Sequence, residues 1–256
     1  MLTVLSPAKS LDFESPLPTR KRSEPRLLDE SSGLIDIMRQ KTPSDIAALM
    51  HISDDLAHLN ATRYRDFSPE HTPRNARAAV LAFNGDVYQG LSARTLGERD
   101  FTEAQKTVRI LSGLYGVLRP LDLIQPHRLE MGTRLATERG RSLYDWWGDQ
   151  VTDLLRRDLD ESPGADVLVN LASAEYFSVV RPECLGARVI SPRFEDRDQH
   201  GEPRVVSFYA KRARGSMAAW LIRGRVRTPG RLVDFDGDGY AYDEDRSTKD
   251  QPVFVR

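Results

Sequence analysis

The sequence of 256 residues predicts a mixed α+β (α/β) fold: a single compact domain over residues 1–256, with helices covering a mixed sheet. Three observations lead to this prediction. The apolar run Leu2–Leu5, stopped by Pro7, is typical of a buried strand that starts a fold. After Pro163 and Gly164, segments with strand character alternate with segments of helical character. No internal repeat or low-complexity tract divides the chain.

The first third of the chain carries turn and helix signals. Residues 14–26 contain three prolines and the basic triplet Arg20-Lys21-Arg22, so we expect a surface loop there. Thr42-Pro43-Ser44-Asp45 predicts the start of a helix, because it combines a hydroxyl cap, a proline at the first helical position and an acid in the first turn. Ser53-Asp54-Asp55 predicts a second helix start in the same way. Residues 77–83 are a candidate strand.

The remaining elements follow from the same periodicity and punctuation. They are a helix capped by Thr102 that runs through Val108, Ile110 and Leu111 and breaks at Gly113 and Gly116, a helix over 143–159, strands over 166–171, 188–191 and 204–209, helices over 174–180 and 212–222, and a closing strand at Val253–Val255.

Composition excludes several classes of protein. Cys184 is the only cysteine, so an intramolecular disulfide and a multi-thiolate metal site are both impossible, which suits a reducing compartment. The N-terminus lacks the cationic region and apolar stretch of a signal peptide, and no apolar run approaches the ~20 residues that span a bilayer. We therefore expect a cytoplasmic protein with no membrane partner.

Positive charge is concentrated in one stretch, although the chain as a whole is balanced at a formal net charge of −1. Residues 203–233 contain no acid and eight basic residues, namely Arg204, Lys211, Arg212, Arg214, Arg223, Arg225, Arg227 and Arg231. Local accumulation of this kind is expected of a surface that contacts phosphate. The alternative is an ordinary solvated arginine-rich face.

Two closely spaced glycines, Gly113 and Gly116, follow the predicted helix that ends near Leu111. Glycine permits positive φ and a close backbone approach, so a tight turn here could direct N–H groups at an anion. The pattern resembles a helix-hairpin-helix element, which grips the DNA backbone without reading bases. An ordinary helix C-cap is the competing interpretation.

Three other motifs suggest chemistry and are weaker. Ser6-Pro7-Ala8-Lys9 fits a Ser-x-x-Lys acyl-transfer motif, but its partner tripeptides are absent. Residues 234–239 look like half of a calcium loop without the bidentate Glu. His51, Asp55 and His58 are spaced to share one helical face and could form part of a metal site.

Several blocks in order along the whole chain resemble the YaaA family. They are Ser6–Phe13, Phe83–Tyr88, Ile110–Gly132, Asn170–Tyr176, Tyr209–Gly215 and Gly239-Tyr240. The resemblance implies a role in surviving hydrogen peroxide, where the family limits damage driven by intracellular iron. It also implies a single α/β domain with a helix-hairpin-helix element and a basic cleft that binds duplex and distorted DNA.

Carried over to matching positions, the resemblance implies DNA contacts from Lys9, Arg119, Arg128, Lys211 and Arg214, with backbone contacts from Gly113 and Gly116. We therefore expect a monomeric DNA-backbone-binding protein with no cofactor and no metal. The same blocks also hold polar groups that a phosphate surface does not require, namely Asp86, Tyr88, Asp122, Glu130, Asn170, Ser173, Glu175 and Tyr176. These groups either orient the cleft arginines through ion pairs or line a catalytic pocket.

Two alternative functions remain open at this point. The first is an enzyme that acts on a small anionic or nucleotide substrate in the same cleft, with Glu130 or Glu175 as general acid or base. The second is direct iron binding, for which only the His51, Asp55 and His58 face offers ligands. We expect binding rather than catalysis, provided that the separated basic residues converge on one concave surface.

Overall fold

A five-stranded mixed sheet forms the centre of the computed structural model, which describes all residues 1–256. Its order is β4-β3-β1-β6-β7, with β1 (Leu2–Leu5), β3 (Val108–Ser112), β4 (Gly116–Leu118), β6 (Val167–Leu171) and β7 (Arg188–Ile190). Strand β1 pairs in parallel with both β3 and β6, and only β4 runs antiparallel to its neighbour. All four residues of β1 are buried, as expected for a central parallel strand with both faces covered. The predicted mixed sheet is confirmed.

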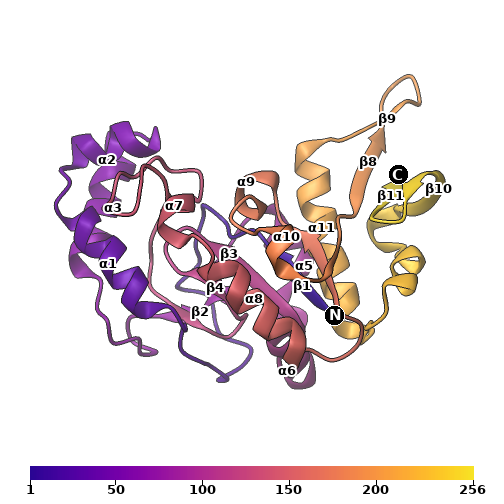
Figure 1. Cartoon of the computed structure of the whole chain (residues 1–256), viewed down its shortest axis with the longest axis horizontal. Helices are drawn as coiled ribbons and strands as arrows, with labels where there is room; N and C mark the ends of the chain where they lie inside the picture. Colours follow the sequence, from indigo (N-terminus) through magenta and orange to yellow (C-terminus); the bar gives the residue numbers. More distant parts are fainter.

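A second sheet lies at the C-terminal end of the molecule (Figure 1). Its order is β10-β11-β8-β9, with β8 (Arg193–Arg197), β9 (Pro203–Arg204), β10 (Ala241–Thr248) and β11 (Gln251–Val255). Packed aromatic rings, including Phe194 stacked on Phe254 with ring centroids 5.5 Å apart, fill the space behind it. A minor two-stranded sheet pairs β2 (Arg77–Ala78) with β5 (Leu123–Ile124).

Three helices gather at the opposite end of the molecule, shown in indigo and violet in Figure 1. They are α1 (Leu28–Arg39), α2 (Pro43–Met50) and α3 (Asp54–Asp66). The predicted start of α2 is confirmed, because Thr42 and Asp45 form a reciprocal capping box and Pro43 is the first helical residue. The predicted start of α3 after Ser53 is also confirmed.

The remaining helices cover the sheets and position the loops. They are α4 (Ala79–Ala82), α5 (Asp86–Leu91), α6 (Glu98–Thr107), α7 (Leu143–Trp147), α8 (Gln150–Glu161), α9 (Ala174–Phe177), α10 (Pro182–Leu185) and α11 (Ser207–Arg223), with 3₁₀ turns η1 (Ala93–Thr95), η2 (Pro229–Asp234) and η3 (Gly237–Gly239). None of the helices has both the length and the apolar character needed to cross a membrane.

Helices α5 and α11 approach each other backbone to backbone. A Cβ atom added at Gly215 would overlap the carbonyl oxygen of Val87, and one added at Gly90 would overlap that of Arg212. Only glycine allows such an approach, because any side chain would hold the helices apart. The contact fixes the position of α11 beside the start of α5, which matters for the site described below.

A buried ion-pair cluster ties α8 to the central sheet and to the N-terminal loop. Asp158 of α8, which is 2% exposed, accepts hydrogen bonds from both terminal nitrogens of Arg26, at 2.6 and 2.8 Å. It also accepts one from Nε of Arg109 on β3, at 2.5 Å. Burial raises the pKa of Asp158, but the hydrogen bonds and charges of the two arginines outweigh burial and hold that pKa below its ordinary value.

The prediction of a helix continuing to Leu111 is wrong. Helix α6 ends at Thr107 and the apolar residues that follow form strand β3, so Gly113 and Gly116 lie in a β-hairpin turn between β3 and β4. The helix-hairpin-helix element predicted at these glycines is therefore wrong. The physical reason is that a short apolar run fits a buried strand as well as a buried helix.

Other boundaries also differ from the predictions. Residues 77–83 form two residues of strand and one helical turn rather than one strand; of residues 204–209, only Arg204 belongs to a strand, β9, and residues 207–209 begin α11. The helix predicted over 143–159 is broken into α7 and α8 at Gly148, which has φ +49°. Helix α1 has no side-chain cap at its start, and the sequence pattern did not reveal it.

Candidate functional site

A cleft of about 460 Å³ opens at the carboxyl ends of strands β1 and β6. Its walls come from the segment after β1, the start of α5, the start of α9 and the N-terminal half of α11. In open sheets with parallel strands, ligands bind outside the carboxyl ends of the strands, where the loops diverge. The topology therefore places this cleft where a ligand site is expected.

The floor of the cleft is a hydrogen-bonded serine pair. Oγ of Ser6, directly after β1, accepts a hydrogen bond from the backbone N–H of Ser173 at 2.8 Å and lies 3.3 Å from Oγ of Ser173. Ser173 in turn caps the N-terminus of α9. The hydroxyl of Tyr88 on α5 donates to the carbonyl oxygen of Ser6 at 3.0 Å, and burial raises the pKa of that hydroxyl well above its ordinary range. The three elements are thus locked together beneath the cleft.

Three basic side chains line the cleft, and two of them come from α11. Arg214 is half-buried and has no hydrogen bond or ion pair to any carboxylate, so loss of hydration lowers the pKa of its guanidinium. Lys211, one helical turn earlier, is exposed and also unpaired. Lys9, which follows β1, forms an ion pair with Glu130 at 2.9 Å. Arg214 is the unusual member, because buried charges in proteins are normally paired.

Glu130 is held between two cations. Its Oε2 lies 2.9 Å from Nζ of Lys9, and its Oε1 accepts from Arg128 at 2.9 Å. Arg128 and Lys9 also line a smaller hollow that adjoins the cleft. Glu130 thus forms ion pairs with two of the predicted cations, as the first of the two alternatives for these carboxylates expects.

Two carboxylates, Asp86 and Glu175, line the cleft itself. Oε1 of Glu175 accepts a hydrogen bond from the backbone N–H of Gly132 at 3.0 Å, which fixes the carboxylate at the rim. Asp86 lies in the first turn of α5. The cleft therefore combines three cations with two carboxylates, a mixture that suits a ligand with both anionic and hydrogen-bonding groups.

Three of the predicted site residues lie outside both this cleft and the smaller hollow beside it. Gly113 and Gly116 are buried, with the indole N–H of Trp147 donating to the carbonyl oxygen of Gly113 at 3.0 Å, so this turn has no free surface for phosphate. Arg119 pairs with Asp122 at 2.9 Å and donates to the carbonyl oxygen of Glu24 at 2.9 Å. The structure brings together the other predicted residues, namely Lys9, Arg128, Lys211 and Arg214 with Glu130 and Glu175.

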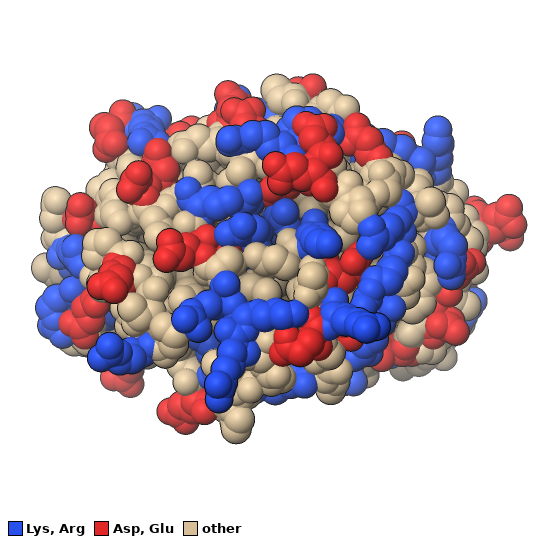
Figure 2. Space-filling model, turned by 90° about the horizontal axis from the view of Figure 1, so that it is seen from below, with Lys and Arg blue, Asp and Glu red and all other residues tan.

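The acid-free stretch 203–233 is not one continuous basic surface. Arg225 pairs with Asp100 at 2.8 Å and Arg227 with Glu103 at 2.9 Å, and both acids belong to α6. These pairs neutralise two of the arginines near the end of the stretch, whereas Lys211, Arg212 and Arg214 in its first half form no ion pair. Figure 2 shows the molecule from below the view of Figure 1, which is the side where α6 is labelled. On this face, basic and acidic side chains are interspersed.

The weaker motifs lose support. His51 has left-handed backbone geometry in the turn before α3, so it does not share a helical face with Asp55 and His58. No group of three or more His, Cys, Asp or Glu side chains in the structure is arranged to hold a metal ion. Ser6 is not among the predicted site residues, and its position directly after a buried parallel strand is the sequence signal that points to the site.

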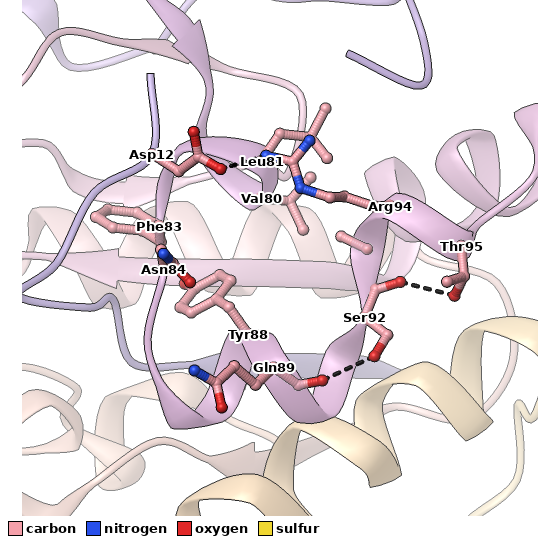
Figure 3. Close-up of a pocket in the computed structure, with 11 residues that line it drawn as sticks. Asp12, Val80, Leu81, Phe83, Asn84, Tyr88, Gln89, Ser92, Arg94 and Thr95 are labelled. Atoms are coloured by element: carbon pink, nitrogen blue, oxygen red, sulfur yellow. Dashed lines mark hydrogen bonds and ion pairs between the residues drawn. The ribbon is translucent and has the colours of Figure 1, made fainter. Parts of the chain in front are cut away.

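Tyr88 also lines a smaller cavity of about 260 Å³ (Figure 3). Phe83 and Asn84 lie on one side of it, and an ion pair between Asp12 and Arg94, at 2.5 Å, closes another. Hydrogen bonds from the segment after Asp12 and the nearby arginine hold the pKa of this carboxyl far below its ordinary value. Because its charges are already paired, this cavity is a weaker candidate for an anionic ligand than the cleft.

Comparison with known protein sequences covers nearly the whole chain. The family described as "Peroxide stress protein YaaA" matches residues 1–246. The chain belongs to the YaaA family. A UPF0246 protein of Tolumonas auensis is 55% identical over 256 residues, and one of Cupriavidus metallidurans is 55% identical over 258; each comparison covers 100% of this chain and 98% of the relative. The resemblance predicted from the sequence blocks is confirmed, and the family name links the YaaA fold to peroxide stress.

Proposed function

We propose that this YaaA-family chain acts in the peroxide stress response by binding the DNA backbone in the cleft between α9 and α11. Lys211 and Arg214 would contact phosphate groups, and Lys9 would join them when phosphate competes with Glu130 for its ammonium group. The carboxylates in the cleft repel phosphate, so contact with several neighbouring phosphates is unfavourable. We therefore infer that the protein contacts only a short segment of the DNA backbone.

The observation that carries this proposal is the half-buried, unpaired guanidinium of Arg214. A half-buried cation without a counterion is costly, and the fully buried Arg109 is paired with Asp158 at 2.5 Å. A phosphate group supplies both the missing charge and an acceptor geometry that matches guanidinium. The site is therefore suited to an anion that arrives from solution.

Binding of this kind offers a direct route to protection from iron. Lysine and arginine that neutralise phosphates release the cations condensed on DNA. Fe²⁺ bound to the backbone would be among the cations displaced, and oxidation driven by peroxide would then occur away from the DNA.

A salt titration of DNA binding tests the proposal. The double variant Lys211→Gln/Arg214→Gln should weaken binding and reduce the slope of log affinity against log salt by about 2, since each lost phosphate contact removes roughly 0.9. The matched control is Arg231→Gln, which lies in the same acid-free stretch but pairs with Asp234 at 2.7 Å on the surface. Thermal unfolding of each variant shows whether the fold is intact. Equal slopes for wild type and double variant would refute the proposal.

One observation favours a second candidate function, an enzyme acting on a small anionic or nucleotide substrate. The cleft holds Glu175 fixed by a backbone hydrogen bond at 3.0 Å, opposite cations suited to phosphate, and its volume of about 460 Å³ fits one nucleotide better than a duplex. The variant Glu175→Gln separates the two functions. It should abolish turnover if Glu175 is a general acid or base, whereas it should strengthen DNA binding a few-fold if the carboxylate only repels phosphate.

A further inference from the structure

The first turn of α11 carries a half-exposed aromatic side chain, Phe208. Phe208 is 50% exposed, and Phe208 and Tyr209 are the only aromatic residues among the large hydrophobic side chains that the molecule exposes. The ring of Tyr209 is covered by the guanidinium of Arg256, 4.5 Å from the ring centroid. The rings of Phe208 and Tyr209 lie 5.4 Å apart at an interplanar angle of 68°, and half of the Phe208 surface remains exposed to solvent.

Phe208 belongs to the same row of side chains as the cleft cations. Phe208, Lys211 and Arg214 stand at i, i+3 and i+6 on α11, so each is a neighbour of the next along one side of the helix. The row spans about 9 Å along the helix axis, from the exposed first turn to the cleft. At a rise of 3.4 Å for each nucleotide in a strand, this length accommodates about two to three nucleotides. In Figure 1 this end of α11 lies at the top of the view, near α9.

The charged side chains that follow Phe208 in the first two turns of α11 are all basic. Lys211, Arg212 and Arg214 form no ion pairs, and the first turn of α11 contains no acid and no capping side chain. The uncapped helix N-terminus adds partial positive charge to that of the side chains. An exposed aromatic ring beside unpaired cations is the combination that binds nucleic acid strands, in which cations contact phosphates and bases stack on the ring.

We propose that Phe208 is a stacking platform for one unpaired DNA base, whose neighbouring phosphates lie against Lys211 and Arg214. This inference rests on the proposed function and makes it more specific. In an intact duplex both faces of every internal base are covered by neighbouring base pairs, so only a single strand, a bulge or a frayed end can present a free face to the ring. The site therefore selects locally unpaired DNA over intact duplex.

The test compares a short single-stranded oligonucleotide with its blunt duplex by fluorescence anisotropy. Phe208→Ala should weaken binding to the single strand by about 5- to 30-fold, the effect of losing one stacked base, and binding to the blunt duplex by less than about 2-fold. Phe208→Tyr should retain the affinity for the single strand, whereas Phe208→Leu, which is apolar but lacks an aromatic face, should lose it. Leu59→Ala is the matched control, since Leu59 is 44% exposed on α3, away from the cleft.

Salt dependence separates this inference from the proposed function. Phe208→Ala should leave the salt slope of single-strand binding unchanged, because it removes no charge, whereas Lys211→Gln should reduce it by about 0.7. If wild-type protein binds neither DNA at low salt, the proposed function fails. The stacking inference alone is overturned if wild type binds both DNAs and Phe208→Ala weakens the two affinities equally or not at all. The same conclusion follows if Phe208→Ala weakens only the binding of the protein to anionic phospholipid vesicles.

Discussion

Replacement of Asp158 by asparagine tests how strongly the buried charge cluster stabilises the fold. Asp158 is 2% exposed and accepts three hydrogen bonds from Arg26 and Arg109, the latter only 5% exposed. Asp158→Asn keeps the shape of the side chain but leaves Arg109 buried without a counterion. Breaking a buried ion pair from one side costs about 3–5 kcal/mol. For a chain of this size, that loss lowers the melting temperature by roughly 6–20 °C.

The same helix supplies the control. Asp160 also pairs with an arginine, Arg156, at 2.5 Å, but its side chain is 65% exposed. Asp160→Asn should therefore cost less than about 1 kcal/mol, as surface ion pairs do. Circular dichroism during thermal and chemical denaturation measures both variants. A loss for Asp158→Asn no larger than that for Asp160→Asn would refute the reasoning.

The pH dependence of stability provides a second comparison, between wild type and Asp158→Asn. The folded-state pKa of Asp158 lies below its unfolded value of about 3.9, so protonation favours the unfolded chain. The stabilisation from the charged carboxylate is therefore fully present above about pH 4 and is lost as the pH falls through the folded-state pKa. The difference in stability between wild type and Asp158→Asn should be constant near neutral pH and shrink in acid.

Two further predictions concern packing and titration. Gly215→Ala should lower the melting temperature and weaken DNA binding, because its Cβ would overlap the carbonyl oxygen of Val87 and push α11 away from α5; Gly230→Ala, whose Cβ meets nothing within 4 Å, should change neither. Burial lowers the pKa of His127 to about 4, so between about pH 6.5 and pH 4 the unfolded chain takes up a proton that the folded chain refuses. Stability should fall over that range by about 3 kcal/mol more in wild type than in His127→Gln, as measured by denaturation at each pH. An unchanged melting temperature for Gly215→Ala, or parallel pH profiles for wild type and His127→Gln, would contradict these predictions.

Local signals in the sequence predicted those parts of the fold that depend on neighbouring residues. The capping box at Thr42 and the apolar strand Leu2–Leu5 are examples, since each is complete within a few residues. Strand β3 was mistaken for helix because its partners, β1 and β4, determine its conformation. Arg109 adds to the ambiguity, since a charged residue in a buried strand is explained only by Asp158, which lies 49 residues away.

The candidate site was predictable only in part, for the same reason. Lys9, Arg128, Lys211 and Arg214 converge as the resemblance implied, but nothing local shows that Arg225 and Arg227 are neutralised. Their partners on α6 precede them by more than 120 residues, at separations of 125 and 124. A stretch without acids is therefore a poor guide to surface charge when the acids arrive from another helix.

The close contact of Gly90 with α11 and of Gly215 with α5 also limits how far the cleft can change shape when a ligand binds. Two helices that touch through their main chains have no intervening side chains to rearrange, and densely packed interiors deform little. The wall carrying Lys211 and the wall carrying Asp86 therefore keep a constant separation. The ligand, rather than the protein, must therefore change conformation when the complex forms. Flexible polymers are favoured over stiff ones, and the protein itself loses little conformational entropy.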